Sequence, residues 1–292
     1  MGHTTKTGKI LDNTYMIDGF YFDIPELLSL FVVKGGKTAL IDAGTAASAS
    51  KVAESLKAMG LFPVDYLVIT HEHADHMQGT APLVRAMGPG VTVCAGAHAA
   101  AMIEDPGKVG YDFGMGDIEP VKPVRVIGDG DRIDLGGVVL EVITVPGHTP
   151  GHVALYDRPN RNIFVGDSVG YKPDDTTFLA SIIPPWFNLG ELYATIDKLR
   201  KVDFKRVCVG HFGMWDGPEA EGLLDEAGRM FDAYWKFFED NSGRLDDADY
   251  LRKAITEKFL SRSGVVKRVG EAFPAMLASH MRDGYRYAAK RG

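Results

Sequence analysis

The chain alternates between short apolar runs and longer amphipathic stretches. Apolar runs bounded by glycine, proline or aspartate are typical of strands, and a helical period of apolar positions is typical of helices. Tyr66-Leu67-Val68-Ile69-Thr70 exemplifies the first pattern and residues 46–59 the second. By these criteria we expect helices at 46–59, 79–87 and 188–201, and strands near 13–18, 28–34, 37–42, 66–70, 91–94, 124–127, 131–134, 137–145, 152–157, 162–166 and 206–209.

Strands followed by helices recur in both halves of residues 1–217, which predicts an α/β sandwich of two sheets with helices outside. Beyond Gly217-Pro218 the pattern becomes helical, over 219–240, about 246–260 and about 265–290. We therefore expect one domain over 1–217 and a helical appendage over 218–292. The appendage is either a substrate-selecting lid or a solvated cap or dimer surface, and the pattern does not choose. Its candidate apolar wall residues are Phe237, Phe238, Phe259, Phe273, Met276 and Met281.

Composition narrows the range of functions. Of the 292 residues 45% are hydrophobic, enough for a sizeable core, and the formal net charge of -7 argues against general nucleic-acid binding. No apolar run reaches bilayer-spanning length and the first residues lack a signal-peptide core, so a cytoplasmic location with no membrane partner is expected. Cys94 and Cys208 lie in apolar runs typical of buried free thiols.

The strongest chemical signal is a dense cluster of histidine and aspartate after the strand at 66–70. It reads His71-Glu72-His73-Ala74-Asp75-His76, and three further residues, His148, Asp167 and His211, each follow a strand-like run. Imidazole and carboxylate are the ligands that zinc-type ions accept. Alternate histidines share one side of an extended segment, while the following turn can direct Asp75 and His76 elsewhere. Seven such residues suit two adjacent ions better than a closed structural zinc site, which favours cysteine.

Asp167 is the natural bridge between two such ions. A carboxylate has two oxygens and a negative charge, and so relieves the repulsion between neighbouring cations, which a neutral imidazole cannot do. We expect two divalent ions, Zn²⁺ first, with Fe or Mn as alternatives.

The His-x-His-x-Asp-His run, a later histidine, Gly166-Asp167 and Gly210-His211 closely resemble the metallo-β-lactamase-fold hydrolases, especially the glyoxalase II, lactonase and acyl-thioesterase-like branches. The resemblance spans roughly residues 10–215 and implies an αββα sandwich. It implies that one metal is held by His71, His73 and His148 and the other by Asp75, His76 and His211, with Asp167 bridging. It also implies that Asp42, in Ile41-Asp42-Ala43-Gly44, supports the metal ligands by hydrogen bonding.

The implied reaction is metal-dependent hydrolysis of a carboxylic thioester, ester or lactone by a metal-bridging hydroxide. Asp75 is expected to orient the nucleophile or pass a proton to the leaving group. Three alternatives remain open: an iron-dependent persulfide dioxygenase, a phosphodiesterase, or a ligand-binding or regulatory relative with slow turnover.

Residues near the expected site say a little about the small-molecule substrate. Glyoxalase II relatives carry a Cys-Gly-Arg loop after the bridging aspartate, whereas here Ser168-Val169-Gly170-Tyr171 follows, which makes glutathione thioesters less favoured. Lactonase relatives place a catalytic tyrosine in this region, and Tyr171 lies one residue late. Tyr171 is therefore a catalytic candidate, with an ordinary loop aromatic as the alternative.

The remaining histidines are predicted to have other roles. His3, His98 and His280 stand apart from any ligand motif and are expected to be ordinary core or surface residues. His152 lies four residues after His148 and is left open between a metal contact and a polar neighbour of the site.

Overall fold

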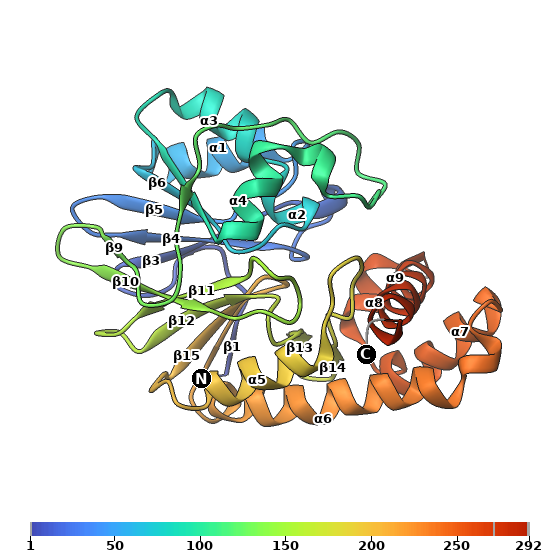
Figure 1. The fold of residues 1–292 in the computed structure, drawn as a ribbon. Coiled ribbons are helices and arrows are strands. Elements are labelled where there is room, and N and C mark those ends of the chain that lie inside the picture. Colours follow the sequence, from blue (N-terminus) through green and yellow to red (C-terminus); the bar gives the residue numbers. More distant parts are fainter. Residues whose placement is uncertain (1, 271, 291–292) are drawn as a thin grey trace.

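Two seven-stranded sheets pack face to face, with helices on both outer surfaces (Figure 1). This computed structural model describes residues 2–270 and 272–290. Its layers confirm the predicted α/β class and αββα sandwich with helices at the C-terminal end. Among the described residues, no helix is long and apolar enough to span a bilayer.

The first sheet runs through the N-terminal half of the chain. Its strands β3, β4 and β5 form the expected antiparallel meander, and β5, β6 and β7 are parallel. Its spatial order is β2 (Gly8–Lys9), β3 (Thr14–Asp18), β4 (Ser29–Lys34), β5 (Thr38–Ile41), β6 (Tyr66–Ile69), β7 (Thr92–Ala95) and β8 (Arg125–Val126). Buried side chains on its outer face pack against α1 (Ala49–Ala58), α3 (Thr80–Met87) and α4 (Ala97–Glu104).

The second sheet comes mainly from the C-terminal half, with β12 and β15 parallel. Its order is β1 (His3–Thr4), β16 (Met214–Asp216), β15 (Arg206–Val209), β12 (Asn162–Gly166), β11 (Val153–Asp157), β10 (Val139–Thr144) and β9 (Arg132–Asp134). Helices α5 (Leu189–Leu199) and α6 (Pro218–Asp240) cover its outer face. The prediction that 206–209 is the last strand was wrong: β16 follows, because its apolar Met214 and Trp215 complete the sheet beside β15.

A two-stranded ribbon, β13 (Tyr171–Asp174) and β14 (Thr177–Leu179), was not predicted. It is short and carries Lys172, Pro173 and Asp174, which hide any strand alternation. Between the two sheets, apolar side chains from both inner faces form a shared core that includes Met16, Phe31, Val68, Leu140, Leu155 and Phe164.

The C-terminal helices are α7 (Ala248–Ile255), a π-helical turn at Thr256–Leu260, α8 (Gly264–Val269) and α9 (Ala272–Ala289). The predicted single helix over 265–290 is divided because Gly270, at φ +93°, ends α8. The predicted boundary at residue 217 coincides with the turn between β16 and α6. Helix α6 buries Phe231 and Tyr234 in the same cluster as Val207 and Trp215 of the sheet, and the division into two domains stays a prediction.

Two glycine positions offer a test of this packing. A Cβ at Gly96, at the start of α4, would lie 2.2 Å from the carbonyl oxygen of Gly151, whereas a Cβ at Gly228, inside α6, meets nothing within 4 Å. We expect Gly96→Ala to lower the free energy of unfolding by about 1–3 kcal/mol through overpacking. Gly228→Ala, the matched control, should raise it by about 0.5–1 kcal/mol because alanine favours a helix. Thermal and urea unfolding measure both, and equal stabilities for the two variants would contradict the close approach at Gly96.

Candidate metal centre

Four of the predicted ligands lie on one turn at the carboxyl end of β6. His71 and His73 follow the strand, and the short helix α2 (Ala74–Met77) then carries Asp75 and His76. The change from strand to helix directs the two pairs of side chains differently, as the spacing predicted.

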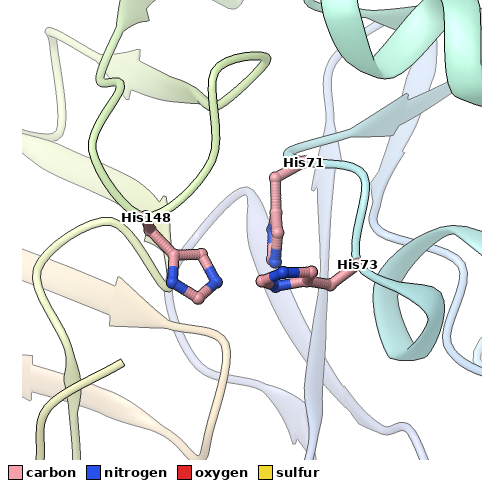
Figure 2. A group of neighbouring side chains, drawn as sticks. All are labelled: His71, His73 and His148. Carbon is pink, nitrogen blue, oxygen red and sulfur yellow. The ribbon is translucent and has the colours of Figure 1, made fainter. Parts of the chain in front are cut away.

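The other three predicted ligands come from the second sheet. His148 lies in the loop between β10 and β11, Asp167 follows β12, and His211 follows β15. The imidazoles of His71, His73 and His148 face one another from two separate loops (Figure 2). The structure therefore brings together all seven residues that the sequence singled out, across the interface of the two sheets.

Among the described residues, three overlapping groups have donor atoms close enough together to hold a metal ion. Within each group, these atoms all lie within 4.8 Å of one another. One contains His71, His73 and His148, and another contains Asp75, His76 and His211. These match the two ligand sets implied by the family resemblance. The third joins His71 and His76 with Asp167, so it overlaps both sets.

Asp167 lies between the two sets. Its Oδ2 is 3.3 Å from Nε2 of His211 and 3.9 Å from Nε2 of His148, and its Oδ1 is 3.7 Å from Nε2 of His76. The backbone passes close to this carboxylate and restricts the space around it. A Cβ at Gly210 would lie 2.3 Å from Oδ1 of Asp167, so a side chain there would displace the carboxylate.

Backbone carbonyl groups orient three of the rings. His148 Nδ1 donates to the carbonyl oxygen of Ser181 (2.8 Å), and His211 Nδ1 donates to that of Leu27 (2.7 Å). His73 bonds through Nε2 to the carbonyl oxygen of Pro184 (3.3 Å), which leaves its Nδ1 free. Each ring thus has one nitrogen fixed and the other available as a ligand, an arrangement typical of metal-binding histidines.

Asp42 orients two more rings, one from each set. Its Oδ2 accepts from His76 Nδ1 (2.9 Å), and its carboxylate accepts both the amide and the hydroxyl of Thr70 (2.7 and 2.9 Å). Because the Thr70 hydroxyl donates to Asp42, its oxygen accepts from His71 Nδ1 (3.0 Å). Asp42 therefore directs Nε2 of both His71 and His76 inward, as a supporting residue of the predicted kind would.

The inward-facing atoms fit bound cations. Nε2 of His71, His76 and His148 and Oδ1 of Asp167 are buried without a hydrogen-bond partner among the described residues. Buried polar atoms without partners are costly, and metal ions held by the two ligand sets would satisfy all four. Nitrogen and oxygen donors of this kind, with no thiolate, are those of a catalytic rather than a structural zinc site.

Electrostatics favour the same occupant. Burial lowers the pKa of His71 and His73 well below the usual imidazole value, which keeps them in the neutral form that binds metals. Burial also opposes charge on His211, but Asp167 and Asp75 outweigh it and raise the pKa of His211 to about 10. The carboxylates thus favour positive charge on the His211 side of the cluster.

Asp75 stays ionised in this environment. Burial by itself would raise the pKa of its carboxyl group, but His76 and then His211 outweigh burial and lower it to about 2. Its Oδ2 lies 3.3 Å from Nε2 of His211.

Glu72, inside the histidine motif, has a structural role that sequence reasoning missed. Its fully buried carboxylate accepts from the Thr149 hydroxyl (2.8 Å) and the Gly151 amide (3.0 Å), and bonds Nδ1 of His98 (2.5 Å). These bonds tie the loop after β6 to the loop that carries His148. No local signal indicates them, since the partners are remote in the chain.

Besides His98, three histidines lie outside the ligand motif, and their outcomes differ. His3 stacks on Trp215, with ring centroids 4.0 Å apart, so it is an ordinary structural residue as predicted. His152 is buried and stacks on His71 at 4.4 Å, outside every donor group. His280, predicted to be unrelated to the site, instead lines the cavity beside Asp75.

Two tyrosines border the candidate site. Tyr171, the predicted catalytic candidate, packs its ring 4.6 Å from that of His211. Burial, with Asp167 and Asp75 nearby, raises its pKa well above the usual phenol value, so its hydroxyl remains a donor. Tyr21, which the sequence did not single out, lies 6.1 Å from His211 and is held protonated by the same causes, burial first. It lies at the start of a short 3-10 helix (Tyr21–Asp23) that no sequence motif marks.

A cavity of about 320 Å³ opens onto this cluster. His73, Asp75, Asp167 and His211 form one side, and α8 and α9 form part of the rest. Two of the six candidate wall residues line the cavity. These are Phe273 and Met276. The other four pack elsewhere in the hydrophobic core, which helix periodicity did not reveal: Phe237, Phe238, Phe259 and Met281.

Comparison with known proteins agrees with this geometry. The family model described as the metallo-beta-lactamase superfamily matches residues 28–211. A hydroxyacylglutathione hydrolase of Ruegeria pomeroyi is 32% identical over 60% of this chain and 58% of its own length, so this chain spans less than two thirds of that relative. An acyl-coenzyme A thioesterase of Gallus gallus is 27% identical over 73% of this chain and 84% of its own length.

Solved structures show the same fold. A metallo-beta-lactamase family protein from Thermus thermophilus aligns with a TM-score of 0.64 at 18% identity, covering 97% of this chain and 95% of its own. An archaeal superfamily protein from Sulfolobus tokodaii aligns with a TM-score of 0.58 at 21% identity, over 76% of this chain and 87% of its own. The region matched by the family model, residues 28–211, contains all seven candidate ligands. This chain belongs to the metallo-beta-lactamase superfamily.

Proposed function

We propose that this protein is a two-metal hydrolase of carboxylic thioesters, esters or lactones. The observation that carries the proposal is the pair of donor groups joined through Asp167 at the end of an apolar cavity. His71, His73 and His148 would hold one ion, and Asp75, His76 and His211 the other, with Zn²⁺ as the expected metal. The names of two relatives, a hydroxyacylglutathione hydrolase and an acyl-coenzyme A thioesterase, favour thioesters within this group.

The reaction replaces the carbonyl carbon's bond to sulfur or oxygen with a bond to the oxygen of water, and the leaving group takes up a proton. Two divalent ions, when bound, lower the pKa of a shared water toward neutrality and polarise the substrate's carbonyl oxygen. The roles left to the protein are transfer of the proton and stabilisation of the negative charge that develops on the carbonyl oxygen.

Asp75 and Tyr171 suit these two roles. The ionised carboxylate of Asp75 can take up the proton that the attacking water loses and afterwards pass it to the leaving group. The protonated hydroxyl of Tyr171, beside His211, can donate to the oxygen that becomes negatively charged as the carbonyl is attacked. A panel of thioesters, lactones and phosphodiesters, with metal analysis and oxygen uptake, separates this proposal from the phosphodiesterase and dioxygenase alternatives.

Asp167→Asn tests the proposed bridge. The amide has nearly the same shape but no negative charge, so it relieves less of the repulsion between two cations. We expect a lower metal content per chain, and a kcat/KM reduced by about 100-fold or more. Metal analysis and thioester hydrolysis measure the two effects, with the exposed Asp12→Asn as control. Wild-type metal content and activity in Asp167→Asn would contradict the assignment.

Asp42→Asn tests the supporting hydrogen bonds. Asp42 has φ +64°, a conformation that asparagine also tolerates, so the backbone is preserved. The neutral amide orients His76 and Thr70 less firmly, and we expect metal affinity or activity to fall by about 10–100-fold. Metal titration should report the loss while circular dichroism stays unchanged. Unaltered metal affinity would remove Asp42 from the proposed site.

The buried thiols give a test of the nucleophile. Burial raises the pKa of Cys94 to about 11 and raises that of Cys208 as well, so both stay protonated and shielded at pH 8. We expect iodoacetamide at pH 8 to leave native activity intact and both cysteines unlabelled by mass spectrometry. Labelling after denaturation is the control, and rapid inactivation of the native protein would point to a thiol-dependent reaction instead.

A further inference from the structure

The cavity beside the candidate metal centre has two chemically different sides. The donor residues His73, Asp75, Asp167 and His211 lie together on one side, with Tyr21 and Tyr171 next to them. Most of the other lining residues are apolar. A substrate whose carbonyl group lies at the donor side must therefore place its remaining part against hydrocarbon side chains.

One apolar wall is a single face of α9. Ala272, Phe273, Met276 and Leu277 line the cavity, and His280 follows one turn later. The spacing of three to four residues places them along the same helix face. Val265 and Val269, four residues apart on α8, extend this wall. Both helices lie beyond residue 211, where the match to the family model ends.

Another wall is the segment between β3 and β4, which contributes Tyr21, Phe22, Ile24 and Leu27. Its backbone has positive φ at Phe20, Phe22, Asp23 and Glu26, a costly conformation for such residues and one that clusters at functional sites.

Hydrogen bonds hold this loop in place. The amides of Phe20 and Glu26 both donate to the carboxylate of Asp18, each at 2.8 Å. Arg268 of α8 then reaches the Glu26 carboxylate (2.7 Å) and its carbonyl oxygen (3.0 Å). The two walls are thereby joined to each other.

The charge of the lining restricts what can bind. Among the described residues that line the cavity there is no lysine or arginine, and the carboxylates present are Glu26, Asp75 and Asp167. Away from the candidate metal ligands, a substrate group that carries carboxylates or phosphates would therefore meet no lysine or arginine among these lining residues. An uncharged hydrocarbon chain is not repelled by the carboxylates of the lining, and its burial against apolar side chains is favourable.

We propose that the apolar part of this cavity binds a saturated acyl chain, and that Met276 of α9 sets the chain length accepted. This rests on the proposed function, because the acyl carbonyl must lie at the metal ligands. The polar thiol or alcohol carrier then lies outside the apolar walls. Met276 is well placed for this role, since it is partly exposed and lines the cavity from the middle of the α9 face.

A homologous series of acyl thioesters from two to twelve carbons, on one uncharged thiol, provides the test. For the metal-loaded wild type we expect kcat/KM to rise by up to about fourfold for each added methylene that is buried, and then to level off. Met276→Trp should move the plateau to shorter chains, whereas Met276→Ala should move it to longer chains. Calorimetric binding of non-hydrolysable alkyl thioethers should follow the same order without turnover.

Ala275→Trp is the matched control, because Ala275 is an exposed neighbour on α9 that does not line the cavity. It should keep the wild-type profile. A flat dependence on chain length, or an equal loss for all chains in Met276→Trp, would overturn the acyl-chain inference while leaving the hydrolase intact. If the metal-loaded protein hydrolyses no ester, thioester or lactone of any length, the proposed function itself fails, and binding of alkyl thioethers then decides separately whether the cavity holds such chains.

Discussion

Negative charge buried among imidazole rings is the constraint on which the rest of this structure depends. Asp167 is 4% exposed and Asp42 is 2% exposed, and both lie within the cluster of histidines. Uncompensated charges in such surroundings cost several kcal/mol, on the order expected for a broken buried ion pair. Cations in the centre would compensate Asp167 and satisfy the unpaired ring nitrogens together. In each candidate ligand ring, one nitrogen hydrogen-bonds to a supporting group and the other is available to bind a metal ion.

The supports come from both sheets, so the same contacts hold the site and join the two halves of the fold. Leu27, before β4, fixes His211 after β15, while Ser181 fixes His148 through a neighbouring loop. Glu72 connects the loop after β6 to the loop after β10. Long-range hydrogen bonds of this kind pre-organise the donors, and the ordering entropy is then lost during folding rather than at metal binding.

The candidate ligands and part of the cavity wall come from different regions of the chain. The candidate ligands all lie within residues 28–211, the region shared with the superfamily, whereas α8 and α9 follow it and contribute much of the cavity wall. This division agrees with the general observation that one fold supports many reactions through the segments placed around a common site. Because α8 and α9 line the cavity, a role of the C-terminal helices as a substrate lid remains a proposal beside the alternative of a solvated cap or dimer surface.

The sequence by itself determined the donor set, the meander of β3 to β5 and the layered class, because ligand spacing and apolar periodicity are local properties. Tertiary structure alone decided which aromatic side chains face the cavity. Phe273 lines it and Phe237 packs in the core, although both lie on amphipathic helices. The hydrogen-bond partners of Glu72 and the position of Tyr21 beside the site also could not be predicted from the sequence. The physical reason is that periodicity reveals that a helix has an apolar face, while only packing between distant segments determines what covers it.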